Sequence, residues 1–331
     1  MSRLAPQDID PITGVSFRIG PQDRVATAGS CFAQHIARTL RAKGFRYLVT
    51  EEGPADRGYG VYPARFGNIY TPRQLLQLFD RAYGLFAPVD EAWTLPSGAL
   101  VDPFRPNVEP EGFADLNALA ADRRQHLSAV RAMFEHCDVM VFTLGLTEAW
   151  RSTIDGAVFP LAPGVTGSPS SADGYEFHNF NVAEMLADMR AFIAKLQTVN
   201  PGVRIIITVS PVALMATYER RHVLVSTVYS KAALRVVAEE LCHDQDGIDY
   251  FPSFEIINGP HHRQRYFADD LREVLPEGVD HVMSIFSHHY LNFDQPQQSQ
   301  AAKPPEPIAR EDNAERDALY DVICDEEALD I

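Results

Sequence analysis

Apolar segments of strand length alternate with helix-length segments along most of this sequence. The clearest strand is the run from Val139 to Leu144, in which five of the six residues are apolar. Such a run is typical of a strand that is covered on both faces. Helical periodicity precedes it over residues 116–136 and follows it over 182–199. Strands that alternate with helices predict a parallel sheet whose functional groups lie at the carboxyl ends of the strands.

The same alternation predicts the remaining elements. Residues 24–28 form a short strand that ends in a glycine turn, and a helix follows over 32–43 and stops at Gly44. Thr71 and Pro72 are typical of the cap and the first turn of a helix. The other predicted elements are a buried strand at 203–209, a short strand at 248–251, and helices at 228–244 and 276–290.

Two regions interrupt the alternation. Residues 45–110 are rich in glycine, proline and aromatic residues, and we interpret them as an elaborated insertion that is a candidate cap over the sheet edge. Residues 151–180 are rich in glycine, proline and serine and are predicted to form a long functional loop. We expect one domain over 1–293, and then a disordered linker and a short acidic C-terminal helix over 294–331.

Charge and composition restrict the partners of the chain. The formal net charge is −16 at pH 7, which argues against nucleic acid because phosphates bind to basic faces. The sequence contains no run of 18 apolar residues, so no membrane span is predicted. We expect no signal peptide either, because the N-terminus is polar and lacks an apolar core of signal-peptide length. The four cysteines lie far apart and include no CxxC pair, which fits a reducing compartment. We expect a cytoplasmic protein that needs no cofactor or metal ion.

Polar turns follow three of the predicted strands. They are Gly29-Ser30-Cys31, Gly145-Leu146-Thr147-Glu148 and Val209-Ser210-Pro211. A parallel sheet brings such turns to one edge. The first turn also begins a helix, where the dipole and the N–H groups lower the pKa of a thiol. A serine in the same place needs a neighbouring base.

These motifs resemble those of the GSCFA family, which is named for the pentapeptide found here at 29–33. The resemblance extends to the segments 66–71, 144–150, 209–211, 229–232 and 250–256 and covers most of residues 24–290. The family resembles the SGNH (GDSL-like) hydrolases. That likeness implies a three-layer α/β/α sandwich with a parallel, flavodoxin-like sheet. It also implies ester hydrolysis or acyl transfer, frequently on glycans.

The resemblance leaves two candidates for the nucleophile. The SGNH pattern Gly-Asp-Ser places the nucleophile at Cys31 when it is aligned on Gly29, and at Ser30 when it is aligned on the serine. We favour Cys31. In the structural alternative, Cys31 is a packed core residue and Ser30 a helix cap.

The resemblance also implies a set of oxyanion and substrate-binding residues. In the turn that corresponds to the SGNH block Gly-x-Asn-Asp, the hydroxyl of Thr147 replaces the family's amide as a hydrogen-bond donor. The glycine of the second SGNH block maps onto Gly67, and Asn68 beside it is a further donor. The full set is Gly67, Asn68, Gly145, Thr147, Glu148 and Ser210.

The base is where the sequence departs from the SGNH pattern Asp-x-x-His. Asp270 matches the aspartate, but Glu273 occupies the histidine position. His178 is the first substitute and His281 the second, ahead of the histidines at 261, 262, 288 and 289. Carboxylates beside a thiol raise its pKa. If Asp270 and Glu273 adjoin the turn, a serine nucleophile is therefore favoured over a cysteine.

Ser230-Lys231 is similar in sequence to a Ser-Lys dyad, but neighbouring helix residues do not face each other. We interpret the pair as structural or substrate-contacting.

Two hypotheses for function follow. The first is an acyl-ester hydrolase or O-acyltransferase whose substrate is a small acyl molecule, a glycan or a glycolipid precursor. The second is a catalytically silent SGNH-like module that binds a glycan or a protein, with the acidic C-terminal peptide as its docking element.

Overall fold

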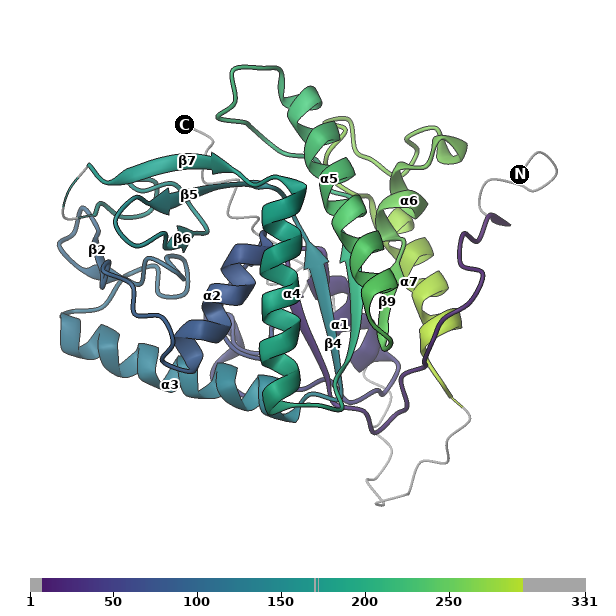
Figure 1. Cartoon of the computed structure of the whole chain (residues 1–331), viewed down its shortest axis with the longest axis horizontal. Coiled ribbons are helices and arrows are strands. Elements are labelled where there is room, and N and C mark those ends of the chain that lie inside the picture. The colour runs from purple at the N-terminus through teal and green to yellow at the C-terminus, as the bar shows by residue number, and fades with distance from the viewer. Residues whose placement is uncertain (1–7, 170, 172, 294–331) are drawn as a thin grey trace, which may run out of the picture.

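The computed structural model describes residues 8–169, 171 and 173–293, and it is built around a parallel sheet (Figure 1). The strands lie in the order β1-β4-β8-β9 and all three neighbouring pairs are parallel. The predicted α/β fold with a parallel sheet is confirmed. The four strands are β1 (Val25–Gly29), β4 (Val139–Leu144), β8 (Arg204–Val209) and β9 (Ile248–Phe251).

Helices cover both faces of this sheet (Figure 1). Successive residues of β4 alternate between two separate apolar clusters, because strand side chains point to opposite faces. Met140 and Phe142 pack with α2 (Pro72–Ala82), α3 (Leu116–His136), α4 (Val182–Val199) and α5 (Val223–Asp244). Val139 and Val141 pack with α1 (Ala33–Ala42), α6 (Ser253–Asn258) and α7 (Pro276–Tyr290). The expected three layers are confirmed.

The helix start expected at Thr71 is also confirmed. The side chain of Thr71 accepts a hydrogen bond from Gln74 N, and the Gln74 side chain accepts one from Thr71 N. This reciprocal capping box satisfies two donors that a helix end leaves unpaired. In contrast, α5 begins at Val223 and not at 228, since exposed apolar residues such as Leu224 and Val225 blur its periodicity.

The prediction of an irregular loop at 151–180 is wrong in part. A three-stranded antiparallel sheet in the order β6-β5-β7 occupies much of this region. Its strands are short and mostly half-exposed, so their residues form no apolar run, and pairing with distant residues sets their conformation. They are β5 (Glu148–Ser152), β6 (Val158–Phe159) and β7 (Tyr175–Asn179).

The insertion at 45–110 contains α2, two short strands and one 3-10 turn. The strands β2 (Trp93–Thr94) and β3 (Leu100–Val101) pair antiparallel, and the turn is η2 (Ala55–Arg57). A second 3-10 turn, η3 (Pro260–His262), precedes α7. The linker and acidic helix expected at 294–331 lie outside the described residues. In the described part of the chain, no helix has the length and apolar character needed to cross a lipid bilayer.

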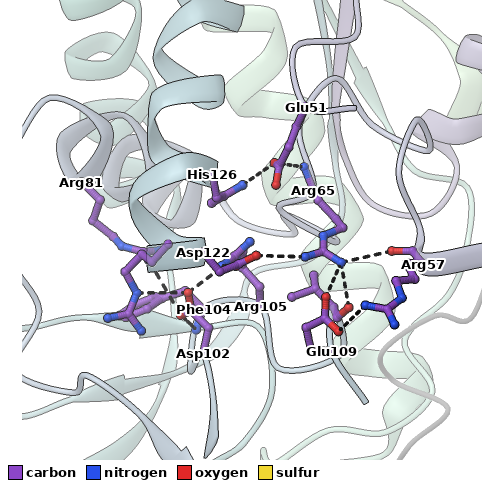
Figure 2. A network of polar contacts seen from close by, with 12 residues as sticks. Glu51, Arg57, Arg65, Arg81, Asp102, Phe104, Arg105, Glu109, Asp122 and His126 are labelled. Carbon is purple, nitrogen blue, oxygen red and sulfur yellow. Dashed lines mark hydrogen bonds and ion pairs between the residues drawn. The ribbon is translucent and has the colours of Figure 1, made fainter. Parts of the chain in front are cut away.

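A network of charged side chains joins the insertion to α3 (Figure 2). His126 is fully buried, and its Nδ1 lies 2.8 Å from the carboxylate of Glu51. Arg65 donates its backbone N–H to Glu51 and its guanidinium to Glu109 and Asp122. Burial lowers the pKa of His126 to about 4, so the imidazole is neutral in the folded protein at neutral pH.

We expect His126 to make the protein less stable in mild acid. An unfolded histidine has a pKa near 6.5. Between that pH and about 4, the unfolded state binds a proton that the folded state excludes, so stability falls as the pH falls. Between pH 7 and pH 4, the wild-type protein should therefore lose on the order of 3 kcal/mol more unfolding free energy than the His126→Gln variant. Urea denaturation at several pH values measures this loss.

His136→Gln is the matched control, because His136 is exposed at the end of the same helix. It should leave the pH dependence unchanged. Part of the acid sensitivity should remain in both variants, since burial also lowers the pKa of His35 to about 4. We expect the unfolding free energy to depend on pH equally in wild type and His136→Gln, and less steeply in His126→Gln. Three identical profiles would contradict the assignment.

Candidate functional site

The turn after β1 is held tightly against β4. Gly29 has φ = +133°, and a Cβ at this position would lie 2.3 Å from the carbonyl oxygen of Thr143. Ser30 N donates a hydrogen bond to the same oxygen at 3.1 Å. Only glycine permits this backbone conformation and this approach. The turn therefore presents Ser30 and Cys31 at a fixed position at the carboxyl end of the sheet.

A pocket of about 260 Å³ lies at this end of the sheet. The turns after β1, β4 and β8 all contribute to it, as the carboxyl ends of adjacent parallel strands should. The segment that precedes α2 and the helix α5 complete it. Its lining consists of Ser30, Cys31, Tyr70, Gly145, Leu146, Ser210, Val212, Ala213, Leu214 and Lys231.

Lys231 is a residue of this pocket whose importance the sequence did not reveal. The side chain is buried, and its Nζ donates a hydrogen bond to the carbonyl oxygen of Gly145 at 2.6 Å. The preceding residue, Ser230, accepts a hydrogen bond from Thr147 N. The two neighbours thus hold the turn after β4 and do not form a dyad with each other. The spacing was the available sequence signal, since Lys231 stands three residues before Leu234 and such residues share a helix face.

The two candidate nucleophiles are both nearly inaccessible to solvent. Ser30 is 3% exposed and Cys31 is 7% exposed. The Oγ atom of Ser30 has no hydrogen-bond partner among the described residues. Cys31 begins the turn into α1, because its carbonyl oxygen accepts a hydrogen bond from Gln34 N. Both side chains line the same pocket.

The carboxylates expected to provide the base lie elsewhere. Asp270 accepts hydrogen bonds from the backbone N–H groups of Arg272 and Glu273, which hold the pKa of its carboxyl below the usual value. Neither Asp270 nor Glu273 is among the residues that line the pocket. Arg272 approaches it instead, since its Nε donates to the carbonyl oxygen of Ala213. Lys231 therefore lines the pocket, and Arg272 contacts one of its lining residues, whereas the two carboxylates do not line it.

The histidines proposed as substitutes have other contacts. His178 on β7 lies with its Nε2 2.9 Å from the carboxylate of Glu184. His281 on α7 lies with its Nδ1 2.7 Å from the hydroxyl of Tyr266. His262 is buried beside this pair, and its ring nitrogens have no hydrogen-bond partner among the described residues. None of these histidines lines the pocket.

The candidate oxyanion residues differ in their availability. The hydroxyl of Thr147 donates to Asn179 Oδ1 at 2.7 Å, so its proton is already used. Asn68 lies near the turn after β1, because Tyr62 donates its hydroxyl to Asn68 Oδ1 and Ile69 N donates to Gly29 O. Gly67 precedes it with φ = +73°. Of the six candidates, Gly145 and Ser210 line the pocket itself.

A larger apolar groove adjoins the pocket and shares Tyr70, Leu146 and Leu214 with it. The groove has a volume of about 670 Å³. Strand β5 supplies three of its lining residues, the segment 159–162 supplies four, and β7 supplies Phe177. Its aromatic residues are Tyr70, Trp150, Phe159, Phe177 and Tyr218. The sequence did not reveal this groove, because the strands that form it were not predicted.

Among the residues that the structure describes, Glu148 is the one carboxylate that lines the groove. It is half-buried, and it accepts a hydrogen bond from the hydroxyl of Thr217 at 2.6 Å. Burial raises the pKa of the Glu148 carboxyl. Among the described residues, no group of three or more His, Cys, Asp or Glu side chains is arranged so that it could hold a metal ion.

Comparisons with known proteins support one assignment. No curated protein matches this sequence. The sequence model of the GSCFA family matches residues 24–286, a span that runs from β1 into α7. This span includes the turns after β1, β4 and β8, together with Lys231 and Glu148. The chain therefore belongs to the GSCFA family.

Proposed function

We propose that this protein is an acyl-group enzyme in which Cys31 is the nucleophile. The observation that carries the proposal is the shared pocket of Cys31 and Lys231 beside an apolar groove. A nearby ammonium group favours the thiolate, which is the reactive form of cysteine. Asp270 and Glu273 are not among the residues that line this pocket, which supports a cysteine over a serine nucleophile.

The chemistry has two steps. In the first, the Cys31 thiolate attacks the carbonyl carbon of an ester or thioester and an acyl-thioester forms on Cys31. The bond to the leaving oxygen or sulfur breaks, and the leaving group takes a proton from water and departs as an alcohol or thiol. In the second, water or an acceptor hydroxyl attacks that carbonyl, which releases the acid or a new ester and restores the thiolate. The Lys231 ammonium and the Ser210 hydroxyl supply hydrogen bonds to the oxyanion of each step.

The groove is the proposed binding site for the acyl group and the acceptor. Its aromatic surface suits an acyl chain, and Trp150 and Tyr218 also suit the apolar face of a sugar ring. The resemblance of the GSCFA family to SGNH enzymes supports a glycan or glycolipid precursor as the acceptor. An acceptor bound in this groove would lie beside Glu148, because Glu148 lines the groove.

We propose Glu148 as the base that takes the proton from water or from the acceptor hydroxyl. Because burial raises its pKa, activity should fall as the pH drops through a value above the usual range for a glutamate. Glu148→Gln should lower kcat about 100-fold and abolish this acidic limb of the profile. The measurement is kcat for ester turnover as a function of pH.

Glu176→Gln on the neighbouring strand β7 is the control for Glu148→Gln. Glu176 is exposed, forms an ion pair with Arg151 and does not line the groove. Its variant should retain both the rate and the acidic limb of wild type. An unchanged acidic limb in Glu148→Gln would assign the base to another group.

Thiol labelling tests the nucleophile directly. Iodoacetamide should modify Cys31 at a lower pH than Cys242, since burial raises the pKa of Cys242 to about 12. Lys231→Met should slow labelling of Cys31 at pH 7 about tenfold, with no change at Cys242. Peptide mass mapping measures both sites in one sample. A labelling rate of Cys31 that is independent of Lys231 would refute the proposed role of the lysine.

One observation favours the second candidate, a silent binding module: within residues 8–169, 171 and 173–293, no imidazole lines the pocket. An acyl-enzyme adduct separates the two candidates. Mixing the protein with an activated thioester and quenching in acid should give a mass increase equal to one acyl group on the peptide that contains Cys31. A module that only binds its ligand gives no such covalent adduct.

A further inference from the structure

A second cavity lies on the insertion side of the groove and has a volume of about 360 Å³. It shares Gln74 and Pro160 with the groove. The cavity therefore lies next to the groove. Its lining consists of Phe66, Asn68, Ile69, Gln74, Gln77, Leu78, Arg81, Phe104, Arg105, Val158 and Pro160.

Two arginines of this cavity are buried and incompletely bonded. The side chains of Arg81 and Arg105 are 5% and 1% exposed. Arg81 Nη2 and Arg105 Nη1 are buried and have no hydrogen-bond partner among the described residues. A buried donor without an acceptor costs about 1–3 kcal/mol, and more when it is charged. These N–H groups are suited to a ligand that brings acceptors.

The side-chain acceptors of the same cavity are already used. Gln74 Oε1 accepts from two backbone N–H groups, which leaves its NH₂ group as a donor. Gln77 Oε1 accepts from Val158 N, and Asn68 Oδ1 accepts from Tyr62. The side chains that line the cavity therefore offer donors and positive charge to a ligand.

The carboxylates around the cavity do not match its cations (Figure 2). Asp102 contacts three guanidinium groups, at 3.1 Å from Arg105, 3.1 Å from Arg123 and 3.9 Å from Arg81. Asp122 is shared between Arg105 and Arg65. Of the three, Arg81 lies farthest from Asp102, and its guanidinium lies over the Phe104 ring, 3.8 Å from the ring centroid. Burying a charge is costly unless it is paired and hydrogen-bonded.

We propose that this cavity is an anion-binding subsite for a phosphate or carboxylate group of a small molecule, held by Arg81, Arg105 and Gln74. Guanidinium groups bind both kinds of oxyanion with paired N–H donors. The site does not depend on chemistry at Cys31. Its position beside the groove makes the anionic group part of a molecule that extends toward the pocket.

Inorganic phosphate and acetate are the probes. Titration calorimetry of the whole chain at constant ionic strength should show saturable binding of at least one of them, together with an increase in Tm. Arg81→Gln should weaken this binding about tenfold or more. Preference for phosphate assigns the site to phosphate-bearing ligands, and preference for acetate assigns it to carboxylates. Binding of neither anion overturns the proposal.

Arg123→Gln is the matched control. It removes the same charge from the same partner, Asp102, but Arg123 does not line the cavity. It should leave the anion Kd within twofold of wild type, and an equal loss in both variants overturns the assignment. Arg81→Lys keeps the charge in case Arg81→Gln does not fold, and it should still weaken binding severalfold because the forked donor is lost. Cys31→Ala should bind the anion like wild type, which separates this test from that of the acyl chemistry.

Discussion

Replacing Cys31 by alanine is expected to lower kcat/KM for an ester or thioester substrate by about 10⁴-fold, because no covalent intermediate can form. Ser30→Ala is expected to cost less than about tenfold, since Ser30 Oγ has no hydrogen-bond partner that would remove its proton. The measurement is steady-state turnover of a chromogenic ester, with the acyl-enzyme yield measured in parallel. Cys242→Ala, which removes a thiol that does not line the pocket, should retain wild-type activity.

Stability measurements are needed to read this result correctly. Cys31 is 7% exposed, so truncating it leaves a small space and should cost only about 1 kcal/mol of unfolding free energy. A folded, inactive Cys31→Ala variant is therefore the expected result. The opposite pattern, with activity lost in Ser30→Ala and kept in Cys31→Ala, would make Ser30 the nucleophile.

Gly29→Ala is expected to lower the unfolding free energy by about 3–5 kcal/mol. A methyl group there would lie 2.3 Å from Thr143 O, 2.7 Å from Thr143 N and 2.8 Å from Thr143 Cβ. These are contacts with a central strand, and β4 cannot move away without breaking its pairing with β8. The positive φ of Gly29 adds strain to the clash. Urea denaturation measures the loss.

Gly44→Ala separates the two contributions. Gly44 also has a positive φ, of +77°, but a Cβ there would have no atom within 4 Å. Its substitution should therefore cost about 1 kcal/mol, from the backbone conformation alone. Equal losses in the two variants would show that the close approach to Thr143 contributes nothing.

The sheet and its main helices were predictable because their signals are local. In the run Val139–Leu144 every side chain is buried, and a strand with two covered faces needs an apolar residue at nearly every position. The strand Tyr175–Asn179 has no such signal, since its residues are half-exposed or exposed and its order comes from pairing with Glu148–Ser152. Cross-strand pairing of this kind depends on residues distant in sequence.

The candidate site likewise has a part that the sequence predicts and a part that it does not. That the turns containing Cys31, Gly145 and Ser210 meet follows from the parallel order of the strands, whereas their catalytic roles stay predictions. The contact between Lys231 and Gly145 was not predicted, because the two residues lie 86 positions apart in the sequence. The sequence left both a structural and a substrate-contacting role open for Lys231. The loop before α7 brings Arg272 toward the pocket, although the motif drew attention to its neighbour Glu273.

The pocket and the groove come from different parts of the fold. The rigid turns of the parallel sheet surround Cys31, whereas the antiparallel strands β5 and β7 supply Trp150 and Phe177 to the groove. Substitutions in these strands can therefore reshape the groove while the contact between Gly29 and Thr143 is kept. The ligand that the groove binds can therefore change while the turn that carries Cys31 keeps its conformation.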